Sequence, residues 1–189
     1  MSAIVTPPRM RISVDRYQKM VASGVLTSSD RVELIEGDIL NRALVTPMHA
    51  SVTARLLKRL ILTVGERGSV GPSNPVDLGE FSEPEPDVVV LKPRPDDYAR
   101  AHPKADDVLL LVEVADISLA FDVGPKRDLY ARFGVREYWV VNVIDARIVA
   151  HRHPVCGMFQ QIDEFNVTDT LSPQALPQIQ MAVRELFGR

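Results

Sequence analysis

Two stretches of the chain are almost entirely apolar, and each carries one acidic residue. Residues 87–91 read DVVVL and residues 108–115 read VLLLVEVA. Short runs of this kind, rich in β-branched residues, are typical of central strands that are buried on both faces. A buried strand does not ordinarily contain an unpaired carboxylate, because removing a charge from water is costly. Asp87 and Glu113 are therefore expected to have a charged partner or a function.

A helix after the second run is predicted to bring a lysine to the same place. We expect this helix to begin at an Asp122 cap, to hold Pro125 in its first turn and to end at Gly134. Lys126 then lies on the stripe that faces the core. The other members of that stripe, at helical spacing, are Leu129, Tyr130 and Phe133. The sequence thus directs two acids and one lysine at one buried place.

Composition restricts the classes of function. With a net charge of −3, the chain has no overall attraction to nucleic acid or to an anionic membrane. A polyanion would have to bind through a local patch or through a metal ion. The single cysteine, Cys156, excludes an internal disulfide and a metal cage built from cysteines. No apolar run approaches the roughly 18 residues of a membrane helix, and no signal peptide is evident, so we expect a cytoplasmic protein without membrane contact.

The rest of the chain is expected to complete one domain over residues 1–189, with 1–12 as a lead-in. Periodicity and turn residues predict a helix over 14–22, a strand–turn–strand unit over 31–40, a helix from Pro47 to about Glu66, a strand over 137–143, an antiparallel pair over 146–151 and 158–162, and a short helix over 181–187. The apolar stripe of the second helix comprises Val52, Leu56, Leu57, Leu60, Ile61 and Val64. His151 and His153 are interpreted as residues of a solvated strand edge.

Carboxylates on neighbouring strands suggest metal chemistry. They offer the hard oxygen ligands that Mg²⁺ prefers, and Mg²⁺ polarises phosphoryl oxygens and lowers the pKa of bound water. A lysine beside such an ion can orient or deprotonate that water, or neutralise the charge of the transition state. The alternative is a buried ion pair between Lys126 and Glu113 that only holds a helix to the sheet.

Several sequence blocks occur in an order that carries a resemblance. They are RVELIEGDI, the helix start PMHA, SEPEPDVVV, and EVADISLAFDVGPKRDLYARFGVREYWVV. Together they resemble the Uma-two-type family of restriction-endonuclease-like proteins, a branch of the PD-(D/E)XK nuclease superfamily. The resemblance covers roughly residues 14–187. It implies an α/β fold with a restriction-endonuclease-like core, in which a mixed central β-sheet is flanked by helices and holds a metal site at one end.

The resemblance also implies site residues. Asp87 matches the aspartate of the PD motif, and Glu113 matches the acid of (D/E)XK. Ala115 stands where the lysine of that motif would be, and the family supplies its lysine from the following helix, at the position of Lys126. Two departures concern other positions: Val123 replaces a basic residue found in many relatives, and Asn142 replaces a common acid.

Further acids and a histidine match the family blocks or lie beside the site. Glu33 matches the glutamate of the ELIEG-like block and is implied as a metal ligand or as a base beside the metal, with Glu36 as the fallback. His49 could hydrogen-bond substrate or a catalytic acid, or could cap its helix. Asp116 and Ser118 are candidates for orienting metal-bound water or for capping the turn.

These inferences predict an endonuclease that hydrolyses phosphodiester bonds with Mg²⁺ or Mn²⁺, with DNA as the expected substrate. The predicted metal ligands are Asp87, Glu113 and Glu33, and Lys126 completes the catalytic set. A homodimer is compatible with a two-fold symmetric duplex. Two alternatives stay open: a catalytically silent binding or assembly module that keeps a structural ion-pair cluster, and a hydrolase of small phosphoesters with a pocket under residues 92–104.

Overall fold

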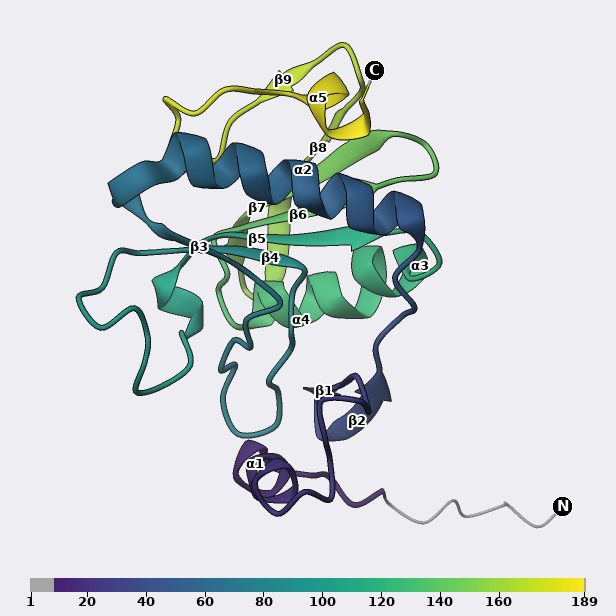
Figure 1. Cartoon of the computed structure of the whole chain (residues 1–189), viewed down its shortest axis with the longest axis vertical. Helices are drawn as coiled ribbons and strands as arrows, with labels where there is room; N and C mark the ends of the chain where they lie inside the picture. Colours follow the sequence, from purple (N-terminus) through teal and green to yellow (C-terminus); the bar gives the residue numbers. More distant parts are fainter. Residues whose placement is uncertain (1–8, 189) are drawn as a thin grey trace, which may run out of the picture. The chain divides into compact units, whose positions relative to one another are not determined.

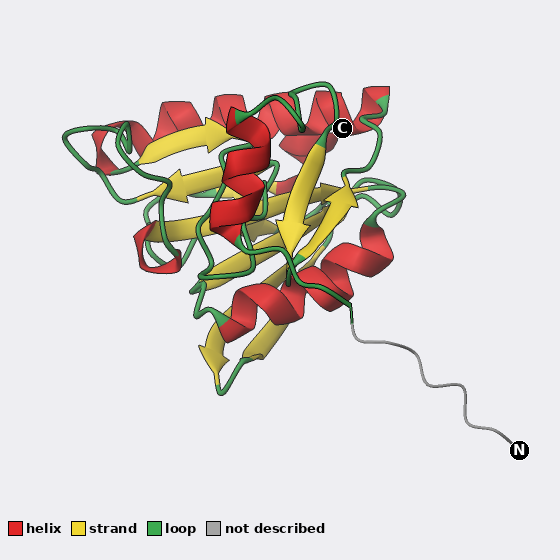
Figure 2. Ribbon diagram, turned by 90° about the horizontal axis from the view of Figure 1, so that it is seen from below, coloured by secondary structure: helices red, strands yellow, loops and turns green. Residues whose placement is uncertain are grey.

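A mixed sheet of six strands, in the order β3-β4-β5-β6-β7-β8, is the central feature of the computed structural model, which describes residues 9–188 (Figure 1). Its strands are β3 (Ser69–Pro72), β4 (Val88–Leu91), β5 (Val108–Ala115), β6 (Glu137–Asn142), β7 (Arg147–Val155) and β8 (Met158–Phe165). Strands β5 and β6 are parallel, and the other neighbours are antiparallel. Figure 2 shows the strands in yellow and the helices in red.

The chain divides into two compact units. Within the described residues, the larger comprises 43–77 and 85–188 and contains the six-stranded sheet, and the smaller comprises 9–42 and 78–84. The organisation as one domain stays a prediction, and residues 1–8 of the expected lead-in lie outside the described residues. No helix within residues 9–188 has the length and apolar character needed to cross a membrane.

The two apolar runs are confirmed as neighbouring strands within the sheet. All four residues of β4 are buried, and so are seven of the eight in β5. Val88 pairs with Val112 in antiparallel register, and continuing that register by one residue places Asp87 opposite Glu113. The pairing of the strands therefore brings the two predicted acids to one end of β4.

Helix α2 (Pro47–Val64) covers one face of the sheet, and α4 (Arg127–Arg132) lies on the other face (Figure 1). The buried line of α2 is Val52, Leu56, Leu60 and Val64, which pack into the core with strand residues such as Val90 and Trp139. Ile61, predicted to belong to this stripe, is 54% exposed. The buried residues of α2 recur every four positions. Ile61 directly follows the buried Leu60, so its side chain is rotated by about 100° away from the core and toward solvent.

The lysine helix begins earlier than predicted, and Phe133 does not belong to its buried stripe. A continuous helical segment runs through α3 (Leu119–Phe121), a π-helical turn η3 (Asp122–Lys126) and α4. Asp122 therefore lies inside the segment and is not its N-cap, because the chain turns helical directly after Ser118. Phe133 is 42% exposed, because α4 ends at Arg132 and Phe133 no longer follows the helical stripe. Gly134, with φ of +75°, ends the helix as expected.

The C-terminal part confirms the antiparallel pair, with strands β7 and β8 longer than predicted. His151 is buried, against our interpretation, because it pairs with Tyr138 on β6 and its ring stacks on that tyrosine. His153 is exposed as expected. Met181 and Ala182 form a short strand, β10, that pairs with β9 (Thr170–Leu171), so the last helix, α5, spans only Val183–Phe187.

The smaller unit contains α1 (Val14–Ala22), capped by Ser13, and the hairpin of β1 (Val32–Ile35) and β2 (Asp38–Asn41). Both turn residues, Glu36 and Gly37, have positive φ, as a tight two-residue hairpin requires. The predicted helix and strand–turn–strand unit are therefore confirmed.

Candidate active site

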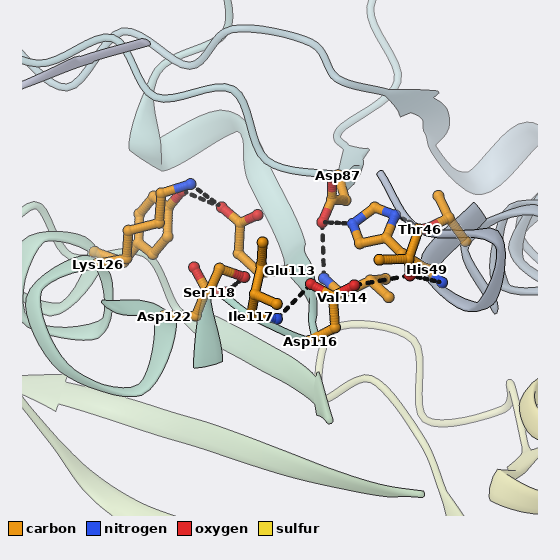
Figure 3. A network of polar contacts seen from close by, with 12 residues as sticks. Thr46, His49, Asp87, Glu113, Val114, Asp116, Ile117, Ser118, Asp122 and Lys126 are labelled. Carbon is orange, nitrogen blue, oxygen red and sulfur yellow. Dashed lines mark hydrogen bonds and ion pairs between the residues drawn. The ribbon is translucent and has the colours of Figure 1, made fainter. Parts of the chain in front are cut away.

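Asp87 is held by groups from two other elements of the larger unit. Its Oδ2 accepts a hydrogen bond from the backbone N–H of Val114 on β5, at 2.8 Å. The same oxygen lies 3.1 Å from Nε2 of His49, which comes from the first turn of α2 (Figure 3). The carboxylate thus joins the beginning of β4 to the neighbouring strand and to the helix above the sheet.

These contacts favour the ionised carboxylate. Burial raises the pKa of Asp87, but the hydrogen bond and the charge of His49, the Val114 N–H and the charge of Lys126 together outweigh it. The pKa of Asp87 is consequently below its ordinary value. Asp87 is a negatively charged oxygen donor at neutral pH.

Glu113 binds the predicted lysine. Its Oε1 accepts hydrogen bonds from Lys126 Nζ at 2.9 Å and from the Tyr130 hydroxyl at 3.0 Å. The side chains of Lys126 and Glu113 are only 6% and 5% exposed. Lys126 is the last residue of the π-helical turn, a type of helical irregularity that often occurs at functional sites. The helix–sheet ion pair that the sequence allowed is therefore present.

Asp116 and Ser118, which follow β5, bind neighbouring side chains. Asp116 Oδ2 accepts a hydrogen bond of 2.8 Å from Thr46, the N-cap of α2. Ser118 donates to Asp122 Oδ2 at 2.6 Å. Both candidates thus organise the turn and its surroundings, and a role toward metal-bound water stays a prediction.

The structure brings together three of the four predicted catalytic residues, Asp87, Glu113 and Lys126, at one end of the sheet (Figure 3). Glu33 is a buried residue of β1 in the smaller unit, and its role as a ligand stays a prediction. Glu36, the fallback, is an exposed residue of the hairpin turn.

The donor set can be compared with the needs of a metal ion. Among residues 9–188, no three His, Cys, Asp or Glu side chains are grouped so that they could hold a metal. Mg²⁺, however, usually retains several waters and is bound through one or two carboxylates. An ionised Asp87 opposite Glu113 matches that requirement. The chemistry of these donors therefore fits a hydrated Mg²⁺ or Mn²⁺.

Two contributors were not assigned from the sequence. Tyr130 was interpreted as a core residue, and it is buried, but its hydroxyl also binds Glu113. Tyr130 lies four residues after Lys126, and this spacing predicts that the two side chains share one face of the helix. Thr46 was not considered at all, although a threonine directly before Pro47 is a typical helix N-cap.

The chain was compared with known proteins. Residues 14–184 match the family Uma2, which is described as "Putative restriction endonuclease". The chain belongs to the Uma2 family. Its structure is similar to the crystal structure of a "putative nuclease belonging to DUF820" from Anabaena variabilis ATCC 29413, with a TM-score of 0.77 and 15% sequence identity over 94% of this chain and 98% of that one. No curated protein matches this chain. The likeness to a solved structure confirms the predicted α/β fold with a mixed central sheet, and the family supports a nuclease role.

Proposed function

We propose that this Uma2 protein is a metal-dependent endonuclease that hydrolyses phosphodiester bonds of DNA. The observation that carries the proposal is the pairing of β4 with β5, which sets an ionised Asp87 opposite Glu113, with Lys126 bound to that glutamate. An arrangement that serves stability alone needs no second carboxylate beside a satisfied ion pair. Membership of a family described as restriction endonucleases supports DNA as the substrate.

Each residue has a proposed part. Asp87 and Glu113 would hold Mg²⁺ or Mn²⁺. When bound, the ion supplies a Lewis acid for a phosphoryl oxygen and lowers the pKa of a coordinated water. Lys126 would orient the attacking water or stabilise negative charge on the phosphate, a part that its ammonium group can play from its contact with Glu113. We further propose that the protein acts in the cytoplasm as a homodimer on duplex DNA.

One observation favours the second candidate, a catalytically silent module. The Lys126–Glu113 pair is almost fully buried and also holds the Tyr130 hydroxyl, as expected of a structural link between helix and sheet. A protein of this kind would keep the fold and the ion pair and would act by binding a partner.

Metal titration separates the two functions. We would titrate Mg²⁺ and Mn²⁺ into metal-free protein by calorimetry, with and without plasmid DNA, and measure plasmid and RNA cleavage in parallel. The proposed function predicts binding and DNA cleavage in the wild type and neither in Asp87→Asn. Asp145→Asn, the same change at an exposed carboxylate, is the matched control and should behave as wild type. Absence of both metal binding and cleavage in the wild type, with DNA present, would overturn the proposal in favour of the silent module.

A further inference from the structure

The first turn of α2 and its N-cap residue contact two acids near Glu113, Asp87 and Asp116. His49 Nε2 lies 3.1 Å from Asp87 Oδ2, and Thr46 Oγ1 donates to Asp116 Oδ2 at 2.8 Å. Asp87 directly precedes β4, where the register of β4 with β5 places it across from Glu113. Asp116 directly follows β5. The two contacts thus connect one helical turn to both acids.

His49 is itself held in place. Its backbone N–H donates to Thr46 Oγ1 at 3.2 Å, the capping bond of α2. Its Nδ1 lies 3.5 Å from Thr53 Oγ1, one turn further along the helix. Because the ionised Asp87 carboxylate can only accept, Nε2 carries the proton of this contact and donates it to Asp87. The ring is therefore oriented by its own helix toward the carboxylate.

The two donors on Asp87 restrict how its carboxylate can turn. Oδ2 accepts from His49 on one side and from the Val114 backbone on the other, so rotation of the carboxylate would break both bonds. The side chains of His49 and Asp87 are 12% and 13% exposed. Because only a small part of each side chain is exposed, water replaces a lost hydrogen bond poorly here.

We propose that His49 is a positioning residue, which fixes the orientation of the Asp87 carboxylate and so determines how well that carboxylate binds the metal. The inference rests on the proposed function, because it takes Asp87 as a metal ligand. Groups that hydrogen-bond a metal ligand typically change metal affinity by about 10-fold to 100-fold when they are removed. His49 acts through Asp87 and needs no contact with the metal or the substrate.

The test compares two replacements of similar size. His49→Leu removes the donor, and His49→Gln retains an N–H group that can reach toward Asp87. We expect calorimetric Mn²⁺ affinity to fall about 10-fold to 100-fold in His49→Leu and to be largely restored in His49→Gln, at comparable unfolding temperatures. Unchanged affinity in His49→Leu, or an equal loss in both variants, would overturn the positioning role.

A second measurement does not depend on metal. In metal-free protein, nuclear magnetic resonance of the imidazole should show a downfield Nε2–H proton that disappears in Asp87→Ala. If the wild type binds no Mn²⁺ the proposed function fails, yet this resonance still reports whether His49 holds Asp87. Absence of the resonance in the wild type, or its persistence unchanged in Asp87→Ala, would contradict the positioning role by itself.

Discussion

Two buried pairs of opposite charge lie in the larger unit, and they are built differently. Lys126 and Glu113 link the helical segment to β5, whereas Arg152 and Glu137 link the neighbouring strands β7 and β6. The Glu137 side chain is 0% exposed and that of Arg152 is 10% exposed. Burial alone therefore does not distinguish a candidate active site from a structural ion pair.

The difference lies in the partners. Arg152 uses Nε on Glu137 and its two remaining nitrogens on Asp163 and on the Ser172 carbonyl. Glu137 also accepts from the Trp139 indole N–H and the Gln174 backbone N–H. This network joins three strands to the C-terminal segment, and the planar guanidinium suits such fixed geometry. It has the character of a structural link.

The Glu113 pair has a second carboxylate beside it. Asp87 is ionised, lies across from Glu113 and is bound by a histidine. The cation of the Glu113 pair is Lys126. Its ammonium group is a point charge on a flexible stem, which suits a reacting group better than a rigid structural link. What identifies the site is thus the convergence of acids from paired strands, and the buried ion pair is only one part of it.

The largest effect on stability is expected at the structural network. Arg152→Met leaves Glu137 as a buried carboxylate without its cation, and removal of one partner from a buried pair typically costs about 3–5 kcal/mol. Denaturant unfolding should show this loss, while Mn²⁺ affinity stays at the wild-type value. Arg147→Met on the same strand is the matched control, because Arg147 pairs with Asp145 and Glu164 at the surface and should change stability by less than about 1 kcal/mol. Equal losses in both variants would contradict the proposed difference.

Acid should lower the free energy of unfolding through His151, which lies on β7 beside Arg152. Burial lowers the pKa of His151 to about 4, and the charge of Arg127 contributes to the decrease. An unfolded histidine titrates near pH 6.5, so the unfolded chain binds more protons between pH 6.5 and 4. The contribution of the neutral ring is complete above pH 6.5 and decreases as the pH falls, by about 3 kcal/mol at pH 4. The free energy of unfolding of the wild type and of His151→Phe, measured between pH 7 and 4, tests this contribution. If the two proteins lost stability in parallel as the pH falls, His151 would not be the source of the loss.

The sequence was sufficient for the parts of the site that follow a regular period. The apolar runs of β4 and β5 placed Asp87 and Glu113 on neighbouring strands, and helical spacing placed Lys126, Leu129 and Tyr130 on the buried side. Regular hydrogen bonding dictates these positions, so a local pattern can reveal them.

Where packing decides, the local pattern failed. His151 looked like an edge residue, but the aromatic rings of Tyr138 and Phe159 pack against it and it is buried. Asp122 looked like a helix cap, but the helix begins earlier and passes through it as a π-helical turn. The contact of His49 with Asp87 was one of the alternatives that the family resemblance offered. It is set by how α2 crosses the sheet, and periodicity does not encode that crossing.

The smallest effect on stability is expected at the candidate site, where both charges are removed together. In the double variant with Glu113→Gln and Lys126→Met, the amide oxygen can still accept from Tyr130, and the methionine fills the space of the lysine stem. Replacing a buried ion pair by neutral groups of similar volume is often neutral, so we expect the free energy of unfolding to change by less than about 1 kcal/mol. Metal binding and DNA cleavage should nevertheless be lost, because a ligand and the lysine are gone.

The control is the double variant with Glu137→Gln and Arg152→Met, which removes the charges of the other buried pair in the same way. There, the amide that replaces the Glu137 carboxylate has one acceptor oxygen for the N–H groups of Trp139 and Gln174, and the Ser172 carbonyl loses its donor. A loss of about 3 kcal/mol is therefore expected, with metal binding intact. A large loss of stability in the Glu113 and Lys126 double variant would instead show that this pair, too, serves the fold. Cleavage at the wild-type rate in that variant would exclude both residues from the chemistry. The combination of unchanged stability with lost activity is expected only if this ion pair is retained for function.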